Sequence, residues 1–304
     1  MSTDLPTPAE LHRFGRIALL GRPNVGKSTL LNAMLGSKLC IVSPKPQTTR
    51  HRILGIVTRP DAQIALLDTP GLHLGGKRAM NRQLNRVARQ VPEEADLIVH
   101  VIEAPRWTEE DQEVWQLISR YPVPRVLAVN KIDRLKEKED LLPFITRITE
   151  SHDYAAVHYL RADRGKGVEK MVKDLVTRLP EGPAQYDEEE FTDRSQRFLA
   201  AELIREQLML RLSEELPYAT TVEIERFEQD GNLARIAAAI WVERDGQKGI
   251  VIGAGGAQLK VIGSSARRGM ERMFGGKVFL ELWVKVRENW SDDDSSLRQL
   301  GYTE

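Results

Sequence analysis

The 304-residue sequence has little cysteine, no net charge and no long apolar run. Its single cysteine, Cys40, excludes an internal disulfide and any cysteine-based zinc finger, and it suits a reducing compartment. Lys plus Arg number 44, as do Asp plus Glu, so an affinity for nucleic acid or membrane would need a local basic patch. No run approaches the roughly 18 apolar residues of a membrane-spanning helix, and residues 1–10 lack the basic and apolar parts of a signal peptide. These absences predict a cytoplasmic protein without a transmembrane segment.

The chain length and a change of pattern along the sequence predict two domains. Between residues 16 and 179, short apolar runs alternate with polar or amphipathic segments, which is typical of strands and crossover helices in a parallel α/β sheet. The expected strands cover residues 17–20, 53–57, 64–67, 97–102, 126–129 and 157–160. Because these runs are almost continuously apolar, we expect a sheet that is buried on both faces.

A stretch rich in Pro, Gly and acidic residues interrupts this pattern, and we interpret residues 182–196 as a linker. The first domain would then cover residues 1–181 and the second residues 197–304. The second opens with apolar residues at helical spacing up to Pro217. Strand patterns follow over residues 220–227, 233–242 and 277–286, with a glycine-rich turn and a helix before the last of them. This order predicts an α+β domain.

A complete phosphate-binding loop follows the first expected strand. It consists of Gly21, Arg22, Pro23, Asn24, Val25, Gly26, Lys27 and Ser28, and Thr29 continues into a helical stretch. The glycines let backbone N–H groups wrap phosphates, and the N-terminus of the helix favours their charge. Lys27 can reach the β- and γ-phosphates, and Ser28 can bind Mg²⁺. An ordinary glycine turn is the alternative, but the motif and its context agree on nucleotide binding.

Two further motifs end later strands of the same expected sheet. The first is Asp68, Thr69, Pro70 and Gly71, and the second is Asn130, Lys131, Ile132 and Asp133. The Asp68 carboxylate can hold Mg²⁺ through water, and the Gly71 N–H can sense a γ-phosphate. The Asp133 carboxylate can accept both N–H donors of the guanine edge, whereas adenine offers no such pair. Each motif alone is a common turn, but their order predicts a guanine-nucleotide site and disfavours an ATPase.

Two segments between these motifs are expected to be mobile. Residues 43–51 have no core pattern, and a threonine there could complete the Mg²⁺ shell only when a γ-phosphate is present, which gives a binary switch. Residues 72–90 are the second segment. Its basic residues are Lys77, Arg78, Arg82, Arg86 and Arg89. They form either a solvated helix face or an RNA contact, and both alternatives stay open.

Leu72 stands where many GTPases carry the glutamine that orients the attacking water. Without that glutamine, we expect hydrolysis that is slow until a partner or a monovalent cation helps, or that relies on another residue to position the water. Asn24, inside the phosphate loop, is the candidate for helping to hold a K⁺ ion. The six histidines show no ligand spacing, so we expect no transition-metal site.

A local basic patch occurs in the second domain. Behind the turn formed by Gly253, Ala254, Gly255 and Gly256 lie Lys260, Arg267, Arg268, Arg272 and Lys277, against only Glu271. A Gly-x-x-Gly turn at the start of a helix lets a nucleic-acid backbone approach closely, as in KH domains. Such a turn alone is weak evidence. With the basic helix behind it, it predicts RNA binding through the turn, Lys260 and Arg267.

Taken in order, these segments resemble the Era family of bacterial GTPases from about Arg13 onward. The segments are GRPNVGKS, QTTRH, DTPG, NKID, DRSQRFLAAELIREQL, ELPYATTVEIERF, VIGAGGAQLKVIG, LELWVKV and LRQLGY. The resemblance implies a Ras-like P-loop GTPase domain followed by an α+β type II KH domain. It implies GTP or GDP and Mg²⁺ as ligands, with Ser28, Thr49 and Asp68 at the metal. Lys27, Asn24, Thr49 and Gly71 would act at the γ-phosphate, and Thr48 with Asn24 would lie near a K⁺ ion.

The resemblance also implies a GTP hydrolase that binds the 3′ end of small-subunit (16S) rRNA and acts in assembly of the 30S ribosomal subunit. A monomer and peripheral association with the inner face of the cell membrane are further expectations. The family usually has Ser-Ala after the last strand of the GTPase domain, whereas this chain has Arg161-Ala162. The Ala162 N–H could still meet guanine O6, while Arg161 is expected to weaken nucleotide affinity. The alternative function is an RNA-binding scaffold with a structural, non-cycling nucleotide.

Overall fold

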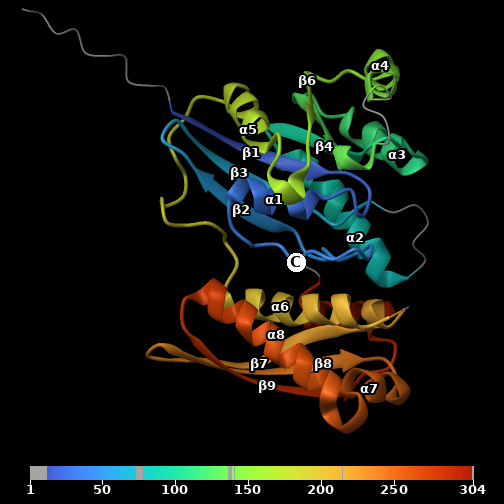
Figure 1. Cartoon of the computed structure of the whole chain (residues 1–304), viewed down its shortest axis with the longest axis vertical. Coiled ribbons are helices and arrows are strands. Elements are labelled where there is room, and N and C mark those ends of the chain that lie inside the picture. Colours follow the sequence, from blue (N-terminus) through green and yellow to red (C-terminus); the bar gives the residue numbers. More distant parts are fainter. Residues whose placement is uncertain (1–11, 73–77, 136–138, 140, 214, 303–304) are drawn as a thin grey trace, which may run out of the picture. The chain divides into compact units, whose positions relative to one another are not determined.

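The computed structural model of the chain describes residues 12–72, 78–135, 139, 141–213 and 215–302 (Figure 1). They form two compact units that do not follow the chain in two continuous blocks. The first unit contains the described parts of residues 1–37, 53–69 and 89–193. The second contains those of residues 38–52, 70–88 and 194–304. The two segments expected to be mobile therefore belong largely to the unit that carries the C-terminal domain.

The described residues of the first unit form a six-stranded sheet in the order β2-β3-β1-β4-β5-β6. The strands are β1 (Arg13–Leu20), β2 (Ile53–Thr58), β3 (Ala62–Asp68), β4 (Leu97–Glu103), β5 (Arg125–Asn130) and β6 (Ala156–Tyr159). All neighbours are parallel except β2 and β3, which are antiparallel. A parallel arrangement throughout is thus the wrong prediction for β2, because the short connection after Thr58 leaves no room for a crossover helix.

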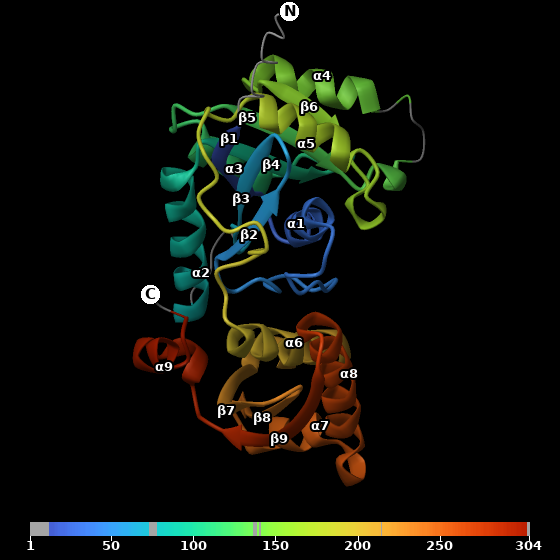
Figure 2. The same cartoon turned by 90° about the vertical axis from the view of Figure 1, so that its left-hand side faces the viewer.

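Helices cover both faces of this sheet, as its apolar strands require. Those with residues in the first unit are α1 (Lys27–Leu35), α2 (Ala79–Gln90, its last two residues only), α3 (Glu109–Ile118), α4 (Leu141–Ser151) and α5 (Val168–Thr177). All seven residues of β3 are buried. Helices α1 and α5 pack against each other (Figures 1 and 2), while Ile145 and Ile148 of α4 join a cluster with residues of β4 and β5.

The expected linker runs along the edge of the first unit instead of crossing open solvent. The backbone N–H of Ile56 in β2 donates to Phe191 O at 2.9 Å. The side chain of Gln63 in β3, which is fully buried, accepts from the N–H groups of Gln185 and Tyr186 and donates to Tyr186 O. The acidic stretch therefore satisfies polar groups of β2 and β3.

The C-terminal part of the second unit has the element order αββααβ followed by a short tail. Its elements are α6 (Gln196–Arg211), η5 (Leu216–Ala219), β7 (Thr221–Asp230), β8 (Leu233–Val242), α7 (Asp245–Ile252), η6 (Ala254–Gly256), α8 (Ala257–Phe274), β9 (Lys277–Val286), η7 (Trp290–Asp292) and α9 (Asp294–Gln299). The sheet has the order β7-β8-β9, with β7 and β8 antiparallel and β8 and β9 parallel. Helices α6 and α8 lie side by side on one of its faces (Figure 2).

One face of β8 and β9 builds the core of this unit together with α6 and α8. Ile236, Ile240 and Val284 are buried together with Leu203 of α6 and Met270 of α8. Helix α6 ends at Arg211, five residues earlier than its expected end, because the chain becomes extended at Leu212 before η5 begins. The sequence pattern missed α7, since two glycines in eight residues disguise a helix.

A second, smaller core joins α2 to the C-terminal tail. Ala79, Met80 and Leu84 of α2 are buried against Trp290, Leu297 and Tyr302. The Ala79 N–H at the start of α2 donates to the Asp292 carboxylate at 2.7 Å. This cluster explains why α2 belongs mainly to the second unit. Among the helices of the described ranges, none is long and apolar enough to cross a membrane.

Candidate functional site

The phosphate loop between β1 and α1 is shaped by close backbone contacts. Gly26 has φ 102°, and a Cβ atom there would lie 2.3 Å from Nδ2 of Asn130. A Cβ atom on Gly21 would lie 2.3 Å from Val101 O. No other residue type fits these positions without displacing the neighbouring strands. The loop therefore keeps its N–H groups free of side chains, as a phosphate cradle requires.

The ammonium group of Lys27 lies inside this loop. Lys27 is buried, and its Nζ donates to Gly21 O at 3.0 Å and to Arg22 O at 3.1 Å. Burial lowers the pKa of Lys27 to about 8, although the Asp68 carboxylate opposes this shift. A bound phosphate would supply the negative charge that stabilises the ammonium form. The residues present thus fit a nucleotide phosphate.

The hydroxyl of Ser28 and the carboxylate of Asp68 lie together at the start of α1. Ser28 Oγ donates to Asp68 Oδ2 at 2.6 Å, and Asp68 is fully buried at the end of β3. Thr69 fixes the following turn, because its Oγ1 donates to Leu19 O at 3.1 Å. Hydroxyl and carboxylate oxygens are the ligands that Mg²⁺ prefers, so this pair fits the predicted metal site. Thr49, the third predicted ligand, belongs to the second unit.

The predicted base-recognition loop is tied to the phosphate loop by Asn130. Its Nδ2 donates to Val25 O at 2.9 Å, and its Oδ1 accepts the Ala162 N–H at 3.0 Å. The Ala162 N–H predicted to meet guanine O6 is thus bound to Asn130. Asn130 is 3% exposed, so it joins three loops from inside the protein. Ile132 and Asp133 follow in the short helix η2 (Ile132–Arg134).

Asp133 offers its carboxylate at the surface, with 41% of the side chain exposed. Arg161 Nε lies 3.7 Å from Asp133 Oδ1 and 3.2 Å from Asp163 Oδ1. The arginine that replaces the usual small residue therefore contacts the carboxylate that would read guanine. Asp163 also contacts the Arg161 guanidinium, so Arg161 binds Asp133 less strongly than it would alone.

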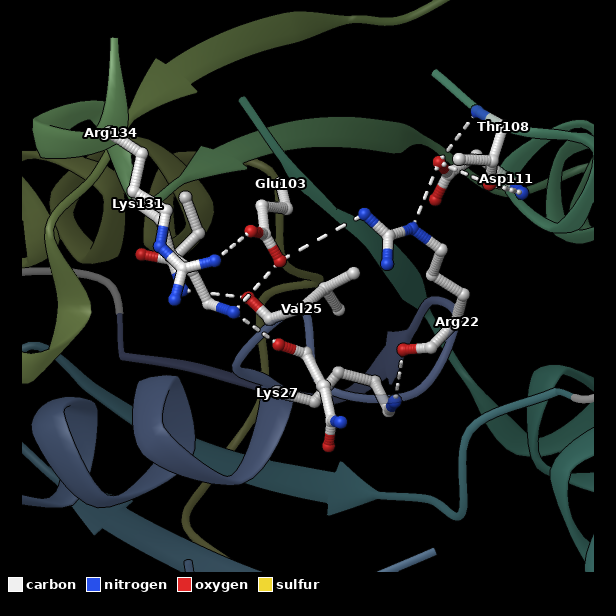
Figure 3. Close-up of polar contacts among 10 residues, drawn as sticks. Arg22, Val25, Lys27, Glu103, Thr108, Asp111, Lys131 and Arg134 are labelled. Carbon is white, nitrogen blue, oxygen red and sulfur yellow. Dashed lines mark hydrogen bonds and ion pairs between the residues drawn. The ribbon is translucent and has the colours of Figure 1, made fainter. Parts of the chain in front are cut away.

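Glu103 links the phosphate loop to the base loop and was missed by the sequence analysis (Figure 3). This last residue of β4 accepts from Lys131 Nζ at 2.8 Å and also pairs with Arg134, while Arg22 Nη2 lies 3.9 Å away. Lys131 Nζ also donates to Asn24 O in the phosphate loop. Burial acts to raise the pKa of Glu103, but Lys131 and Arg134 together outweigh it and lower that pKa. A carboxylate at the end of a strand, between two motifs, was the signal that could have identified it.

The segment expected to be the first mobile loop is packed into the second unit. Thr48 and Thr49 are each 9% exposed, and Arg50 is 2% exposed. Thr48 Oγ1 donates to Lys45 O at 2.7 Å, and Thr48 O accepts from the guanidinium of Arg205 in α6. Arg205 is itself buried and bound to Glu202 at 2.6 Å. Both neighbours of Thr49 are therefore fixed by contacts with the C-terminal domain.

Arg50 occupies a cage of oxygen atoms, which we call the Arg50 cage. Its Nη1 donates to Thr220 O at 2.8 Å and to the Tyr302 hydroxyl at 3.3 Å, and its Nη2 donates to Pro217 O at 3.0 Å. Burial lowers the pKa of Arg50, with the nearby Arg205 acting in the same direction. The next residue, His51, stacks on the Tyr302 ring with centroids 4.8 Å apart. The C-terminal tail thus closes the cage.

The described residues of the second segment expected to be mobile, residues 72–90, are partly buried and partly exposed. Leu72 is 5% exposed, and residues 73–77, including Lys77, lie outside the described residues. Arg82, Arg86 and Arg89 are exposed on α2, opposite its buried apolar residues. An exposed basic face fits a solvated helix and an RNA contact equally well, so both alternatives stay open.

The predicted RNA-binding turn lies between α7 and α8. Gly253, Gly255 and Gly256 all have positive φ, of 73°, 56° and 80°. Behind them is a groove of about 380 Å³, lined by Gly256, Leu259, Lys260, Gly263, Ser264, Arg267, Leu280 and Leu282. Lys260 and Arg267 therefore share one groove with an apolar floor that the sequence analysis did not include. Arg267 also pairs with Glu271 at 2.7 Å.

Comparison with known proteins agrees with both halves of this description. Residues 16–131 match the family described as 50S ribosome-binding GTPases, and residues 215–291 match the KH domain family. The chain is 60% identical over 291 residues to GTPase Era of Stenotrophomonas maltophilia (strain K279a), covering 96% of this chain and 98% of that protein. The same identity and coverage hold for GTPase Era of Xanthomonas campestris pv. campestris (strain B100).

Two solved structures are similar along almost the whole chain. One is a point variant of Aquifex aeolicus Era bound to GDP·AlF₄⁻, with 38% identity, a TM-score of 0.93, and coverage of 96% of this chain and 100% of that one. The other, with the same identity, TM-score and coverage, is Era in complex with MgGDPNP and nucleotides 1506–1542 of 16S ribosomal RNA. The chain therefore belongs to the Era family and is a P-loop GTPase that hydrolyses GTP.

Proposed function

We propose that this GTPase is a nucleotide-controlled switch that binds the 3′ end of small-subunit rRNA and acts in assembly of the 30S subunit. The similar Era structure in complex with nucleotides 1506–1542 of 16S rRNA is the observation that carries this proposal. The groove behind the Gly-x-x-Gly turn supports it, because it combines an open backbone with the cations Lys260 and Arg267.

We propose the following nucleotide roles, which the contacts of Lys27, Ser28 and Asp68 support. Lys27 would bind the β- and γ-phosphates, and Asp133 would read guanine. Ser28, Asp68 and Thr49 would hold Mg²⁺, which neutralises charge on the phosphates when it is bound. The similar Era structure with MgGDPNP supports this ligand set. Gly71, next to the buried Leu72, would bring its N–H to the γ-phosphate.

Hydrolysis would proceed without the glutamine that orients water in many GTPases, because Leu72 occupies its position in this chain. The residue proposed to help is Asn24 of the phosphate loop, which has a positive φ of 63°. We propose that a K⁺ ion assists at Asn24. The hydroxyl of Thr48, the second residue expected near this ion, is bound to Lys45 O inside the second unit.

The switch would operate through the residues beside Thr49. Arg205 holds the carbonyl before it, and the Arg50 cage holds the side chain after it. Recruiting Thr49 to the metal in the GTP state would change the strain on both contacts. Since the partners of Arg50 and Arg205 belong to the C-terminal domain, the nucleotide state would reach the RNA-binding domain by this route.

The experiment that tests the proposal measures binding of the full chain to the 3′-terminal segment of 16S rRNA and to a scrambled control. The protein is loaded either with GDPNP or with GDP. Tighter binding to the native segment in the GDPNP state supports the switch, and Gly255→Asp should abolish that preference while leaving nucleotide affinity intact. Equal binding to native and scrambled RNA would refute the rRNA role.

A scaffold with a non-cycling nucleotide is the rival function. Multiple-turnover GTP hydrolysis that is stimulated by the native RNA segment would exclude it, whereas turnover that ignores RNA would favour it. We propose that the protein acts in the cytoplasm as a monomer. Peripheral membrane association stays a prediction of the family resemblance.

A further inference from the structure

We infer that the first unit has a second ligand site, for a nucleoside phosphate, in a cavity between the loop before α3 and the helix α4. The cavity has a volume of about 550 Å³, within the range of small-molecule sites. Trp107, Phe144 and His152 contribute aromatic rings to its wall, and Arg106 and Arg147 contribute guanidinium groups. None of these residues belongs to the GTP site, so this inference goes beyond the proposed function.

The aromatic wall is held in place before any ligand arrives. Trp107 Nε1 donates to Gln112 Oε1 at 3.2 Å, and His152 Nε2 lies 3.0 Å from the same oxygen. His152 Nδ1 lies 2.7 Å from Ile148 O, and the Trp107 and His152 ring centroids are 4.7 Å apart. Rings fixed in this way lose little conformational freedom when a planar group stacks on them. Stacking on such rings tolerates any base.

The charge of the cavity selects an anion. Arg106 and Arg147 are exposed, and neither side chain has an ion pair with a residue in the described part of the chain. None of the described residues that line the cavity is acidic. Guanidinium groups bind phosphate oxygens in pairs of parallel hydrogen bonds. A planar ring beside a phosphate is the chemistry of a nucleotide, which could be a free mononucleotide or the 5′-phosphate end of an RNA.

Thr108 connects this cavity to the phosphate loop (Figure 3). It lines the cavity and caps α3, with its N–H and Oγ1 donating to Asp111 Oδ2 at 3.0 and 2.9 Å. Arg22 Nε of the phosphate loop donates to the same oxygen at 3.2 Å. Asp111 is fully buried, so its carboxylate cannot turn to water when one donor moves. A ligand that displaces Thr108 would therefore change the support of Arg22 and the release of GDP, and this coupling must be reciprocal.

The test titrates AMP into the full-length protein saturated with GDP and Mg²⁺, which keeps the guanine site occupied. We expect one AMP to bind, seen by calorimetry, with a dissociation constant in the millimolar range or tighter. Arg147→Glu should weaken AMP binding about tenfold or more. Arg120→Glu is the matched control, since Arg120 is an exposed arginine of the same unit outside the cavity, and it should bind AMP like the parent protein.

Two further arms separate the coupling and the source of the ligand. AMP should change the GDP dissociation rate of the parent protein but not of Thr108→Val, which lacks the hydroxyl that reaches Asp111. A short RNA with a 5′-phosphate that displaces AMP, when the 5′-hydroxyl form does not, would identify an RNA end as the ligand. If neither RNA displaces AMP, the site takes free mononucleotides.

No AMP binding to the parent protein, or equal AMP affinity in Arg147→Glu and Arg120→Glu, would overturn the inference. Either result would leave the proposed rRNA role standing, because that role is tested with the 3′-terminal RNA segment and Gly255→Asp. Conversely, AMP binding in a protein that ignores rRNA would support the cavity alone.

Discussion

The phosphate loop and the Arg50 cage solve the same chemical problem with different parts of the chain. Each encloses a cationic side chain with neutral carbonyl oxygens: Gly21 O and Arg22 O around Lys27, and Thr220 O and Pro217 O around Arg50. The carbonyls around Lys27 are 6 and 5 residues away, whereas those around Arg50 are 170 and 167 residues away. Carbonyl oxygens close to the cation in sequence form a site where a ligand can replace them. Carbonyl oxygens far away in sequence connect two parts of the fold through the cation.

This comparison predicts that removing each cation damages a different property. Lys27→Ala should lower GTP affinity about a thousandfold, because the charge facing the β- and γ-phosphates is lost. The free energy of unfolding should not fall, since the variant no longer buries an ammonium group whose charged form burial disfavours. Nucleotide titration and urea denaturation of the full chain measure the two quantities. Lys170→Ala, at an exposed position of α5, is the control, and unchanged GTP affinity of Lys27→Ala would contradict the assignment.

The base loop offers a second way to break the local site. Asp133→Asn should lower GTP affinity about a hundredfold and favour xanthosine triphosphate, because the amide replaces one acceptor with a donor. The matched control is Asp163→Asn, which changes the other carboxylate that Arg161 contacts. Competition between GTP and XTP gives the affinity ratio. An unchanged ratio for Asp133→Asn, or the same shift for Asp163→Asn, would show that guanine is read elsewhere.

Arg50→Met should have the opposite profile to Lys27→Ala. It leaves Thr220 O and Pro217 O without the arginine donors, so the free energy of unfolding should fall by about 2 kcal/mol. GDP affinity should stay unchanged, while the difference in RNA binding between the GDPNP and GDP states should shrink. Arg226→Met, at a half-exposed arginine on β7, is the control. If Arg50→Met kept both its stability and its nucleotide-dependent RNA binding, the Arg50 cage would have no part in the switch.

A buried histidine in the first unit leads to a prediction about how the free energy of unfolding depends on pH. His100 in β4 is fully buried, its Nδ1 lies 2.6 Å from the Tyr154 hydroxyl, and burial lowers its pKa to about 3. The unfolded chain, with an ordinary histidine pKa near 6.5, binds the proton first, so stability is lost as pH falls below that value. Between pH 7 and pH 5 the loss due to His100 should be about 2 kcal/mol.

The experiment compares urea denaturation of the parent protein and of His100→Leu at both pH values. The pH-dependent loss should shrink by about 2 kcal/mol in His100→Leu. The part due to His51, whose pKa burial lowers to about 4, should remain. The full loss should persist in Tyr154→Phe, which removes the hydroxyl partner but keeps the titrating ring. A loss of equal size in His100→Leu would assign it to other groups.

The local nature of the nucleotide site explains why the sequence predicted so much of it. Lys27, Ser28, Asp68 and Asn130 sit where parallel strands end, so motif order and sheet topology together bring them to one edge. The sequence analysis did not identify Glu103, because its role depends on which cations lie near the end of β4. No motif spacing encodes that meeting, since Arg22 and Lys131 reach it from two different loops.

The sequence predicted the strands and the long helices α6 and α8 of the C-terminal domain, but not that residues 38–52 and 70–88 belong to the same unit. The strand patterns over residues 233–242 and 277–286 coincide with the bounds of β8 and β9. The polar composition of residues 43–51 predicts a mobile loop, yet Arg50 is buried beside Tyr302, which lies 252 residues later in the chain. Burial of a charged residue depends on such distant partners, and residue type alone argues against it. The cluster of α2 with Trp290 and Tyr302 was not predicted for the same reason, since its residues are far apart in the chain.

The smallest effect should come from the last atom that closes the Arg50 cage. Tyr302→Phe removes the hydroxyl that accepts from Arg50 and lies 2.7 Å from Thr221 Oγ1, but it keeps the ring that stacks on His51. The free energy of unfolding should fall by about 1 kcal/mol, measured by urea denaturation of the full chain. Tyr218→Phe is the control, because Tyr218 offers Arg50 only its backbone carbonyl. A loss in Tyr302→Phe as large as that in Arg50→Met would mean that the tail hydroxyl, and not the carbonyls of Pro217 and Thr220, holds the arginine.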